Sequence, residues 1–188
     1  QTKGYEATIN LMAVSHAREL ELDEALIQVE KESNVDALYL VDSFGALYSE
    51  QVSHLAKKYK SLMPTKEIGI HAHNNQQLAF ANTIEAIIQN VNFLDGTIFG
   101  IGRAAGNCPL ELLLGFLKNP KYDLRPILEI LESHFVKLKD EIEWGYTIPY
   151  MITGILDLHP RAGMKLRKSD NKDDYIGFFD SLAQSDSA

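Results

Sequence analysis

The chain has 188 residues, of which 45% are hydrophobic and 23% are charged, and its net charge is −8 at pH 7. These values are typical of a globular domain with a sizeable core, and the acidic balance argues against binding of nucleic acid or of an anionic membrane surface. No apolar run approaches the length of a membrane span, and the single cysteine, Cys108, cannot form an internal disulfide. The cytoplasm is therefore the expected location.

Strand-like and helix-like patterns alternate along most of the chain. Strand-like patterns predict strands at 5–12, 37–41, 67–73, 91–99 and, briefly, 122–124. Apolar residues at helical spacing predict helices at 20–32, 49–63, 76–90, from about 107 onward, and at 125–143. Because the first residue is Gln and a strand pattern begins within a few residues, we expect a fragment of a longer protein.

The strand-helix units recur at intervals of roughly 30 residues, which is typical of a parallel sheet with right-handed crossovers. Two closures are common for such units, a doubly wound sheet and an eight-stranded barrel. After residue 143 the pattern changes to an apolar helix at 146–158, a charged connector at 165–174, a short helix at 175–182 and a tail expected to be disordered. The expected domains are residues 1–143 and a helical extension at 144–188.

Two histidines at the end of the strand predicted at 67–73 are the first indication of chemistry. His71 and His73 are separated by one residue, and alternate side chains of a strand point to the same face, so both imidazoles can hold one metal ion. Imidazole suits Mn, Fe, Co or Zn, and Mg becomes possible where carboxylates complete the shell. Two ligands are too few, so a third must come from a neighbouring strand end.

The next strand end carries a glycine loop at residues 99–107. Besides a plain flexible turn, it fits the dinucleotide fingerprint G-x-G-x-x-A through Gly100, Gly102 and Ala105. That interpretation is weak, because the helix begins after the glycines and not within them, and because it leaves both histidines unexplained. Asn107 could cap this helix or ligate a metal through its carbonyl oxygen, and the pattern leaves both possibilities open.

The order of these motifs resembles the metal-dependent aldolase, lyase and synthase barrels, which include 4-hydroxy-2-oxovalerate aldolase, 3-hydroxy-3-methylglutaryl-CoA lyase and isopropylmalate synthase. The resemblance covers roughly residues 5–118 and is carried by the segments 11–16, 41–45, 71–74, 81–83 and 91–111. It implies an α/β fold in which the chain forms the C-terminal part, about strands four to eight, of a (β/α)8 TIM barrel with extra C-terminal helices.

The resemblance also implies a metal site. His71 and His73 would ligate a divalent cation, with Mn²⁺ expected and Mg²⁺, Co²⁺ or Zn²⁺ as alternatives, and Asn107 matches a position that ligates it in some members. The family's remaining ligand is an Asp in an Asp-Arg-Glu type motif on the first strand. That motif and strands one to three are not in these residues, so we expect an incomplete site, with the catalytic base also missing, and an inactive isolated fragment.

Further residues are candidates for contact with a substrate. Ser43 could hydrogen-bond a substrate carboxylate or merely stabilise its turn, and Asn74, Gly102 and Arg103 are grouped with it as substrate-binding candidates. Tyr146 resembles the tyrosine that reaches the substrate in the aldolase branch, where it is a candidate proton donor. A core or interface tyrosine is the alternative for Tyr146.

Other features of the loop and the strand ends separate the branches of the family. The lyase branch has a catalytic cysteine in the glycine loop, whereas this loop carries Arg103 and Ala104. Cys108 lies beyond the loop and is expected to be a small packed residue. Asp42 and Asp95 are expected to orient metal ligands through hydrogen bonds. The missing loop cysteine counts against the lyase branch, and the resemblance of Tyr146 favours the aldolase branch.

The resemblance therefore implies an aldolase that cleaves or forms a carbon–carbon bond of a 4-hydroxy-2-oxo acid through a metal-stabilised pyruvate enolate. An acyl-CoA-dependent Claisen synthase, similar to isopropylmalate synthase, is one alternative. A non-catalytic, metal-stabilised interaction module is another. The expected partners are a small 2-oxo acid and, through the C-terminal helices, a second copy of the chain or a partner enzyme.

Overall fold

A computed structural model describes residues 4–32 and 34–185. Within these residues the chain divides into two compact units. The first unit runs to Ser43 and continues over Leu47–Ala72 and Ala81–Asp95, and the second comprises Phe44–Ala46, His73–Phe80 and the chain from Gly96 onward. The domain boundary predicted at residue 143 stays a prediction.

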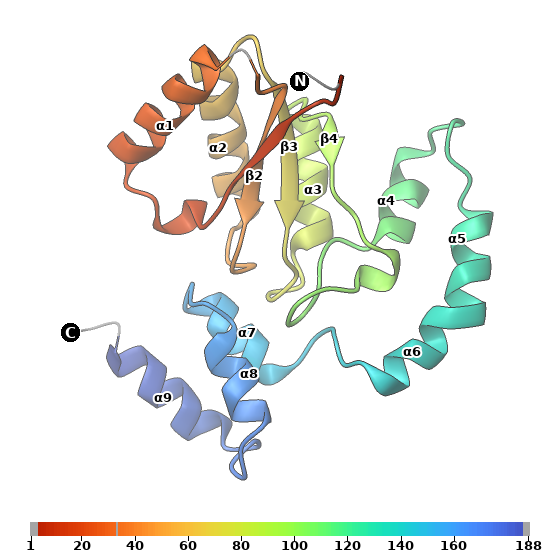
Figure 1. The fold of residues 1–188 in the computed structure, drawn as a ribbon. Coiled ribbons are helices and arrows are strands. Elements are labelled where there is room, and N and C mark those ends of the chain that lie inside the picture. The colour runs from red at the N-terminus through yellow and green to blue at the C-terminus, as the bar shows by residue number, and fades with distance from the viewer. Residues whose placement is uncertain (1–3, 33, 186–188) are drawn as a thin grey trace. The chain divides into compact units, whose positions relative to one another are not determined.

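The sheet lies in the first unit and contains four parallel strands in the described part of the chain (Figure 1). They are β1 (Thr8–Leu11), β2 (Ala37–Asp42), β3 (Glu67–Ala72) and β4 (Phe93–Leu94). Their order in the sheet is their order in the chain. When each strand is added to the same edge of the sheet, right-handed crossovers place all connecting helices on one face, as in a barrel. In a doubly wound sheet the strand order reverses at one point, and helices cover both faces. The strand order therefore favours the barrel.

Helices fill the connections between these strands. They are α1 (Glu19–Lys31), preceded by the 3-10 turn η1 (Val14–His16), α2 (Ser49–Leu62) and α3 (Ala79–Ile88). Most residues of β2 and β3 are buried, and so is one stripe of α1 and α2. The core side chains include Leu38, Leu40, Ile68, Ile70, Leu26, Val52, Ala56 and Tyr59. Each large apolar side chain in this core contributes roughly 1.5–3 kcal/mol through burial.

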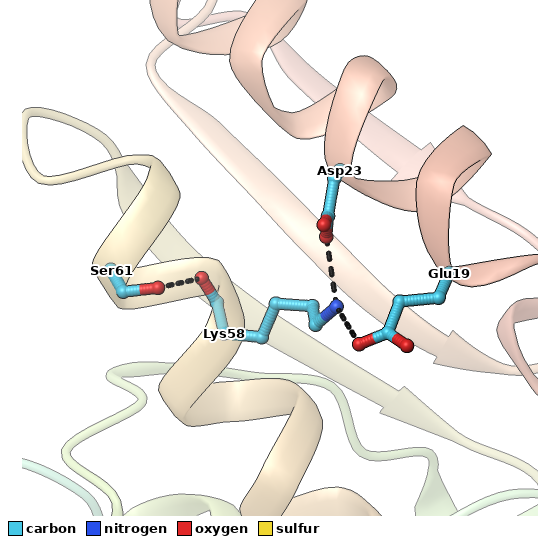
Figure 2. Close-up of polar contacts among 4 residues, drawn as sticks. All are labelled: Glu19, Asp23, Lys58 and Ser61. Carbon is cyan, nitrogen blue, oxygen red and sulfur yellow. Dashed lines mark hydrogen bonds and ion pairs between the residues drawn. The ribbon is translucent and has the colours of Figure 1, made fainter.

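One lysine joins α1 and α2 at the surface of the first unit. Figure 2 shows the side chain of Lys58 reaching between Glu19 and Asp23. Its Nζ lies 3.0 Å from Glu19 Oε1 and 2.8 Å from Asp23 Oδ1. The hydrogen bond with Asp23, followed by that with Glu19, raises the pKa of Lys58. Because Glu19 is 77% exposed and Asp23 only 34%, water screens the contact with Asp23 less.

Strand β4 and helix α3 differ from the prediction. The strand predicted at 91–99 is reduced to β4, and the chain then enters the short 3-10 turn η2 (Ile98–Gly100), where Phe99 has a φ of 56°. Helix α3 begins three residues later than predicted. Asn74 accepts the N–H of Ala79 through its Oδ1 at 3.1 Å, so residues 74–78 form a capped turn instead of a first helical turn.

The second unit contains the helices α4 (Leu110–Leu117), α5 (Arg125–Ile130), α6 (Val136–Glu141), α7 (Ile148–Ile155), α8 (Arg161–Arg167) and α9 (Tyr175–Ser185). The helix predicted at 125–143 forms as α5 and α6 joined by a π-helical turn, η3 (Leu131–Phe135). None of the described helices is long and apolar enough to cross a membrane.

Three predictions for the second unit are wrong. The segment 122–124 forms no strand, and Asp123 Oδ1 instead accepts the Arg125 N–H at 2.9 Å at the start of α5. The charged connector predicted from residue 165 begins inside α8. Helix α9 runs past the predicted end at 182 to Ser185, and the rest of the predicted disordered tail, 186–188, lies outside the described residues.

Candidate functional site

In the first unit, the predicted metal ligand His71 is held by a carboxylate that follows the neighbouring strand. His71 lies on β3, Asp95 follows β4, and His71 Nδ1 is 2.9 Å from Asp95 Oδ2. Asp95 also accepts a hydrogen bond from Tyr39 on β2. Burial, then the negative charge of Asp95 and this hydrogen bond, raise the pKa of Tyr39 and keep its proton in place. The contact of Asp95 with a candidate ligand is therefore present, while the metal-binding role of His71 stays a prediction.

Gly69 makes room for Tyr39 in this cluster. The strand register places Tyr39 opposite Gly69, and Gly69 opposite Phe93. A Cβ on Gly69 would lie 2.5 Å from two ring atoms of Tyr39, which is too close for any side chain. The Tyr39 ring therefore lies across β3 and meets the Phe93 ring edge to face, with centroids 6.4 Å apart. Tyr39 was not predicted from the sequence, although a glycine inside a predicted strand indicates a close approach of another group.

In the second unit, the other two predicted metal ligands pair with each other. His73 and Asn107 form an isolated antiparallel bridge, and the Asn74 N–H donates to the Gly106 carbonyl at 2.8 Å. The amide Nδ2 of Asn107 donates to the Ile101 carbonyl at 3.2 Å. Its Oδ1 is buried and accepts no hydrogen bond from any described residue. A buried oxygen in this position fits a metal ligand, because buried acceptors are otherwise almost always satisfied.

The glycine loop shapes the backbone around Asn107. A Cβ on Gly102 would lie 2.5 Å from Asn107 Nδ2, and a Cβ on Gly106, whose φ is 86°, would overlap the carbonyl oxygen of Gly100. Gly102 thus contacts Asn107, and a substrate contact of Gly102 stays a prediction. Helix α4 begins after Pro109 without a side-chain cap, so the capping alternative for Asn107 is wrong.

These donors fit a divalent metal ion. With its Nδ1 facing Asp95, His71 would bind a metal through Nε2, and such a carboxylate–imidazole pair fixes the ring and raises its basicity in metal sites. Over residues 4–32 and 34–185, no group of three or more His, Cys, Asp or Glu side chains is placed to hold a metal. The predicted ligands are two imidazoles and an amide, and a complete shell requires a further ligand.

Two predicted substrate contacts also fix local structure. Ser43 is buried and its Oγ accepts the Ala13 N–H at 2.8 Å, which supports the turn-stabilising alternative. Asn74 caps the turn before α3, as described above. Asp42 accepts the Leu47 N–H at 3.3 Å through its Oδ2. Contact of Ser43 and Asn74 with a substrate stays a prediction.

Two further predictions concern single side chains. Tyr146 precedes α7 and is 54% exposed, so a core position is excluded, while its role as a proton donor stays a prediction. Cys108 is fully buried, which confirms that it is a packed residue.

Arg103 lies in a cluster that sequence analysis missed. Its Nη1 is 3.1 Å from His159 Nε2, and His159 Nδ1 accepts the backbone N–H of Arg161 at 3.0 Å. The ring of Phe44 meets the His159 ring edge to face, with centroids 5.8 Å apart. Burial and the charges of Arg103 and Arg161 lower the pKa of His159, and burial and the charge of Arg161 lower that of Arg103. The two guanidinium groups therefore favour a neutral His159.

Comparison with known proteins places these residues in a family context. The family model described as HMGL-like matches residues 3–133. A 4-hydroxy-2-oxovalerate aldolase of Thermus thermophilus is 34% identical over 159 residues, which are 78% of this chain and 46% of that protein. An oxaloacetate decarboxylase of Mycobacterium tuberculosis is 36% identical over 118 residues, which are 63% of this chain and 34% of that protein. The chain spans less than half the length of these relatives.

A solved structure agrees with the chain over most of its length. The N-terminal domain of a candidate aldolase from Bacteroides vulgatus is 31% identical and matches with a TM-score of 0.77. The match covers 90% of this chain and 57% of that one.

Proposed function

Because the chain belongs to the HMGL-like family and has the parallel α/β fold of its TIM-barrel domains, we propose that the protein is a divalent-metal-dependent carbon–carbon lyase that acts on a 4-hydroxy-2-oxo acid. The observation that carries the proposal is the pairing of His71 with Asp95, since a carboxylate behind an imidazole is the usual support of a metal-binding histidine. The relatives named 4-hydroxy-2-oxovalerate aldolase support the choice of substrate class.

In this proposal, His71, His73 and Asn107 hold the metal. Asp95 orients the His71 ring, and Tyr39 in turn fixes Asp95 by donating its hydroxyl proton. When bound, a divalent cation supplies Lewis-acid polarisation of the carboxylate and keto oxygens of a 2-oxo acid. We take Mn²⁺ as the expected metal, with Mg²⁺, Co²⁺ and Zn²⁺ as the alternatives to test. A carboxylate from elsewhere in the protein completes the shell.

The remaining candidates contact the substrate. Ser43, Asn74, Gly102 and Arg103 bind it, and Tyr146 supplies a proton. A base outside these residues removes the proton of the 4-hydroxyl, the bond between C3 and C4 breaks, and its electron pair forms pyruvate enolate while the aldehyde leaves. Tyr146 then donates its proton to C3, which gives pyruvate. The exposed position of Tyr146 supports access to a substrate.

A second candidate function is decarboxylation of a 2-oxo diacid. The Mycobacterium tuberculosis relative named oxaloacetate decarboxylase favours it. The same enolate is the product of this cleavage, with carbon dioxide as the leaving molecule in place of an aldehyde. Claisen condensation with an acyl-CoA and a non-catalytic interaction module stay as alternatives, as do the predicted cytoplasmic location and a partner bound through the C-terminal helices.

One assay separates these functions. The intact protein, loaded with Mn²⁺, is given 4-hydroxy-2-oxovalerate, oxaloacetate, or a 2-oxo acid together with acetyl-CoA, and pyruvate, aldehyde, carbon dioxide and free thiol are measured. We expect pyruvate and aldehyde in equal amounts from the first substrate, and loss of this turnover after metal removal. Pyruvate from oxaloacetate alone would establish the decarboxylase instead, and thiol release would establish the synthase. Retention of metal without turnover of any substrate would contradict a lyase.

A further inference from the structure

Both ring nitrogens of His159 face hydrogen-bond donors. We propose that Arg103, His159 and Arg161 form a binding site for an oxyanion, the carboxylate or phosphate group of a small molecule. All three residues belong to the second unit. The inference deepens the substrate-binding role of Arg103 and in that respect rests on the proposed function, but binding of the anion requires neither metal nor turnover.

The hydrogen bonds of His159 carry the first step of the argument. A neutral imidazole has one N–H and one acceptor nitrogen, yet both nitrogens of His159 face donors, the backbone N–H of Arg161 and Nη1 of Arg103. If Nδ1 accepts from Arg161, then Nε2 carries the proton and points it at a guanidinium. When the ring is protonated, both of its N–H groups face a donor, whereas in the neutral ring only one does. In every protonation state, two donors meet without an acceptor between them.

Two positively charged side chains lie near His159. Two guanidinium groups lie close enough to lower the pKa of His159 by their charge. The guanidinium of Arg161 forms no hydrogen bond or ion pair with any residue of the described ranges. An oxyanion has several acceptor lone pairs and a negative charge, so one such group between Arg103 and Arg161 would accept from both and from His159 Nε2.

Apolar packing holds the loop that carries Arg103. Ala104 and Ala105, next to Arg103, are buried against Tyr150 of α7, and Met164 of α8 packs on the same group. This holds the backbone next to Arg103 against α7 and α8, the helices that precede and follow His159 in the chain.

A glutamine anchors the segment that carries Phe44 to the same helix. Gln76 Nε2 lies 3.1 Å from the carbonyl oxygen of Ala46 and 3.2 Å from that of Gly154 in α7. The edge of Phe44 then closes one side of the His159 ring. These contacts hold the surroundings of Arg103 and His159, whereas the exposed Arg161 offers its guanidinium from the surface.

The test measures anion binding by metal-stripped intact protein. Inorganic phosphate, malonate and pyruvate are titrated by calorimetry, and the ring nitrogens of His159 are followed by NMR. We expect binding of at least one probe together with a rise in the pKa of His159, because the bound negative charge stabilises the imidazolium. Tighter binding of phosphate would identify a phosphorylated ligand, and tighter binding of malonate or pyruvate a carboxylate.

Matched variants decide whether the cluster is responsible. Arg161→Gln and His159→Asn should each weaken binding by about tenfold or more, since each loses a charge-assisted contact or a donor. Asn at 159 keeps an acceptor for the Arg161 N–H, so the start of α8 is retained, and Arg161→Lys should restore part of the affinity. Arg125→Gln removes the same charge from an exposed i,i+4 ion pair with Glu129 and should bind as the wild type does.

Two results would overturn the proposal. One is the absence of binding for all three probes, and the other is equal binding by the wild type, Arg161→Gln and His159→Asn. Because neither measurement involves metal or turnover, such a failure leaves the proposed lyase activity standing. Loss of that activity likewise says nothing against the anion site.

Discussion

The polar clusters of the two units are built on opposite principles. In the first unit, Tyr39, His71 and Asp95 come from neighbouring parallel strands or their ends, and a carboxylate lies at the centre of two donors. In the second unit, His159 lies between Arg103 and Arg161, all on loops or at a helix start, and donors face donors. A carboxylate behind an imidazole prepares the ring for a cation, whereas converging guanidinium groups prepare a site for an anion.

The two clusters also differ in what fixes their geometry. The strand register sets the position of the first cluster, because backbone hydrogen bonds hold Tyr39 opposite Gly69 and His71 two residues further along. The second depends on side-chain packing of the loop onto α7 and α8. We therefore expect backbone substitutions to break the first cluster and changes of charge to alter the second.

The largest expected effect is the loss of a ligand from the first cluster. His71→Ala in the intact protein should lower metal-dependent turnover of a 4-hydroxy-2-oxo acid by more than about 100-fold, because it removes an imidazole that the proposal assigns to the metal. The measurement is the steady-state release of pyruvate. His54→Ala, on the exposed face of α2, is the matched control and should retain turnover. Unchanged turnover in His71→Ala would contradict the proposed metal site.

Substitution of the residues that support His71 should have a smaller effect. Asp95→Asn keeps the shape of the side chain but removes the charge that orients His71, and it should weaken Mn²⁺ binding by roughly 10–100-fold, as measured by titration. Tyr39→Phe removes one hydrogen bond to Asp95 and should weaken it by roughly tenfold or less. If both variants bind Mn²⁺ like the wild type, the carboxylate plays no part in a metal site.

A backbone substitution tests whether the register holds the first cluster. Gly69→Ala forces the Tyr39 ring away from β3 and should lower the free energy of unfolding by about 1–3 kcal/mol, measured by urea denaturation. Gly115→Ala is the matched control, because a Cβ there meets nothing within 4 Å in α4, and it should raise stability by about 0.5–1 kcal/mol. Equal effects of the two substitutions would contradict the close approach at Gly69.

The smallest expected effect concerns the second cluster and pH. Partial burial and the charges of Arg103 and Arg161 lower the pKa of His159 in the folded chain, so below about pH 6.5 the unfolded chain binds more protons than the folded one. The free energy of unfolding should therefore fall as the pH drops through this range. Arg161→Gln should reduce that slope, and His159→Asn should remove the contribution of this ring. An unchanged slope in both variants would show that His159 does not titrate in this way.

Local pattern was enough to predict most of the elements. The sequence spacing of apolar residues located β2, β3, α1 and α2 to within a few residues, because β2 and β3 are continuous buried apolar runs and the two helices bury apolar residues at helical spacing. The pattern failed where backbone geometry overrides it. The strand β4 ends at Leu94, the chain then enters η2, where Phe99 has a positive φ, and Asn107 donates its amide to Ile101 instead of capping α4.

Sequence alone determined that the two histidines lie at the end of β3, with His71 on the strand and His73 just past it, because a regular apolar run precedes them. Only the tertiary structure decided what surrounds them. It brought Asp95 to His71 across 24 residues of chain, placed Tyr39 over Gly69, and joined Arg103 to His159 across 56 residues. Such contacts depend on strand register and on packing between distant segments, which no local periodicity encodes.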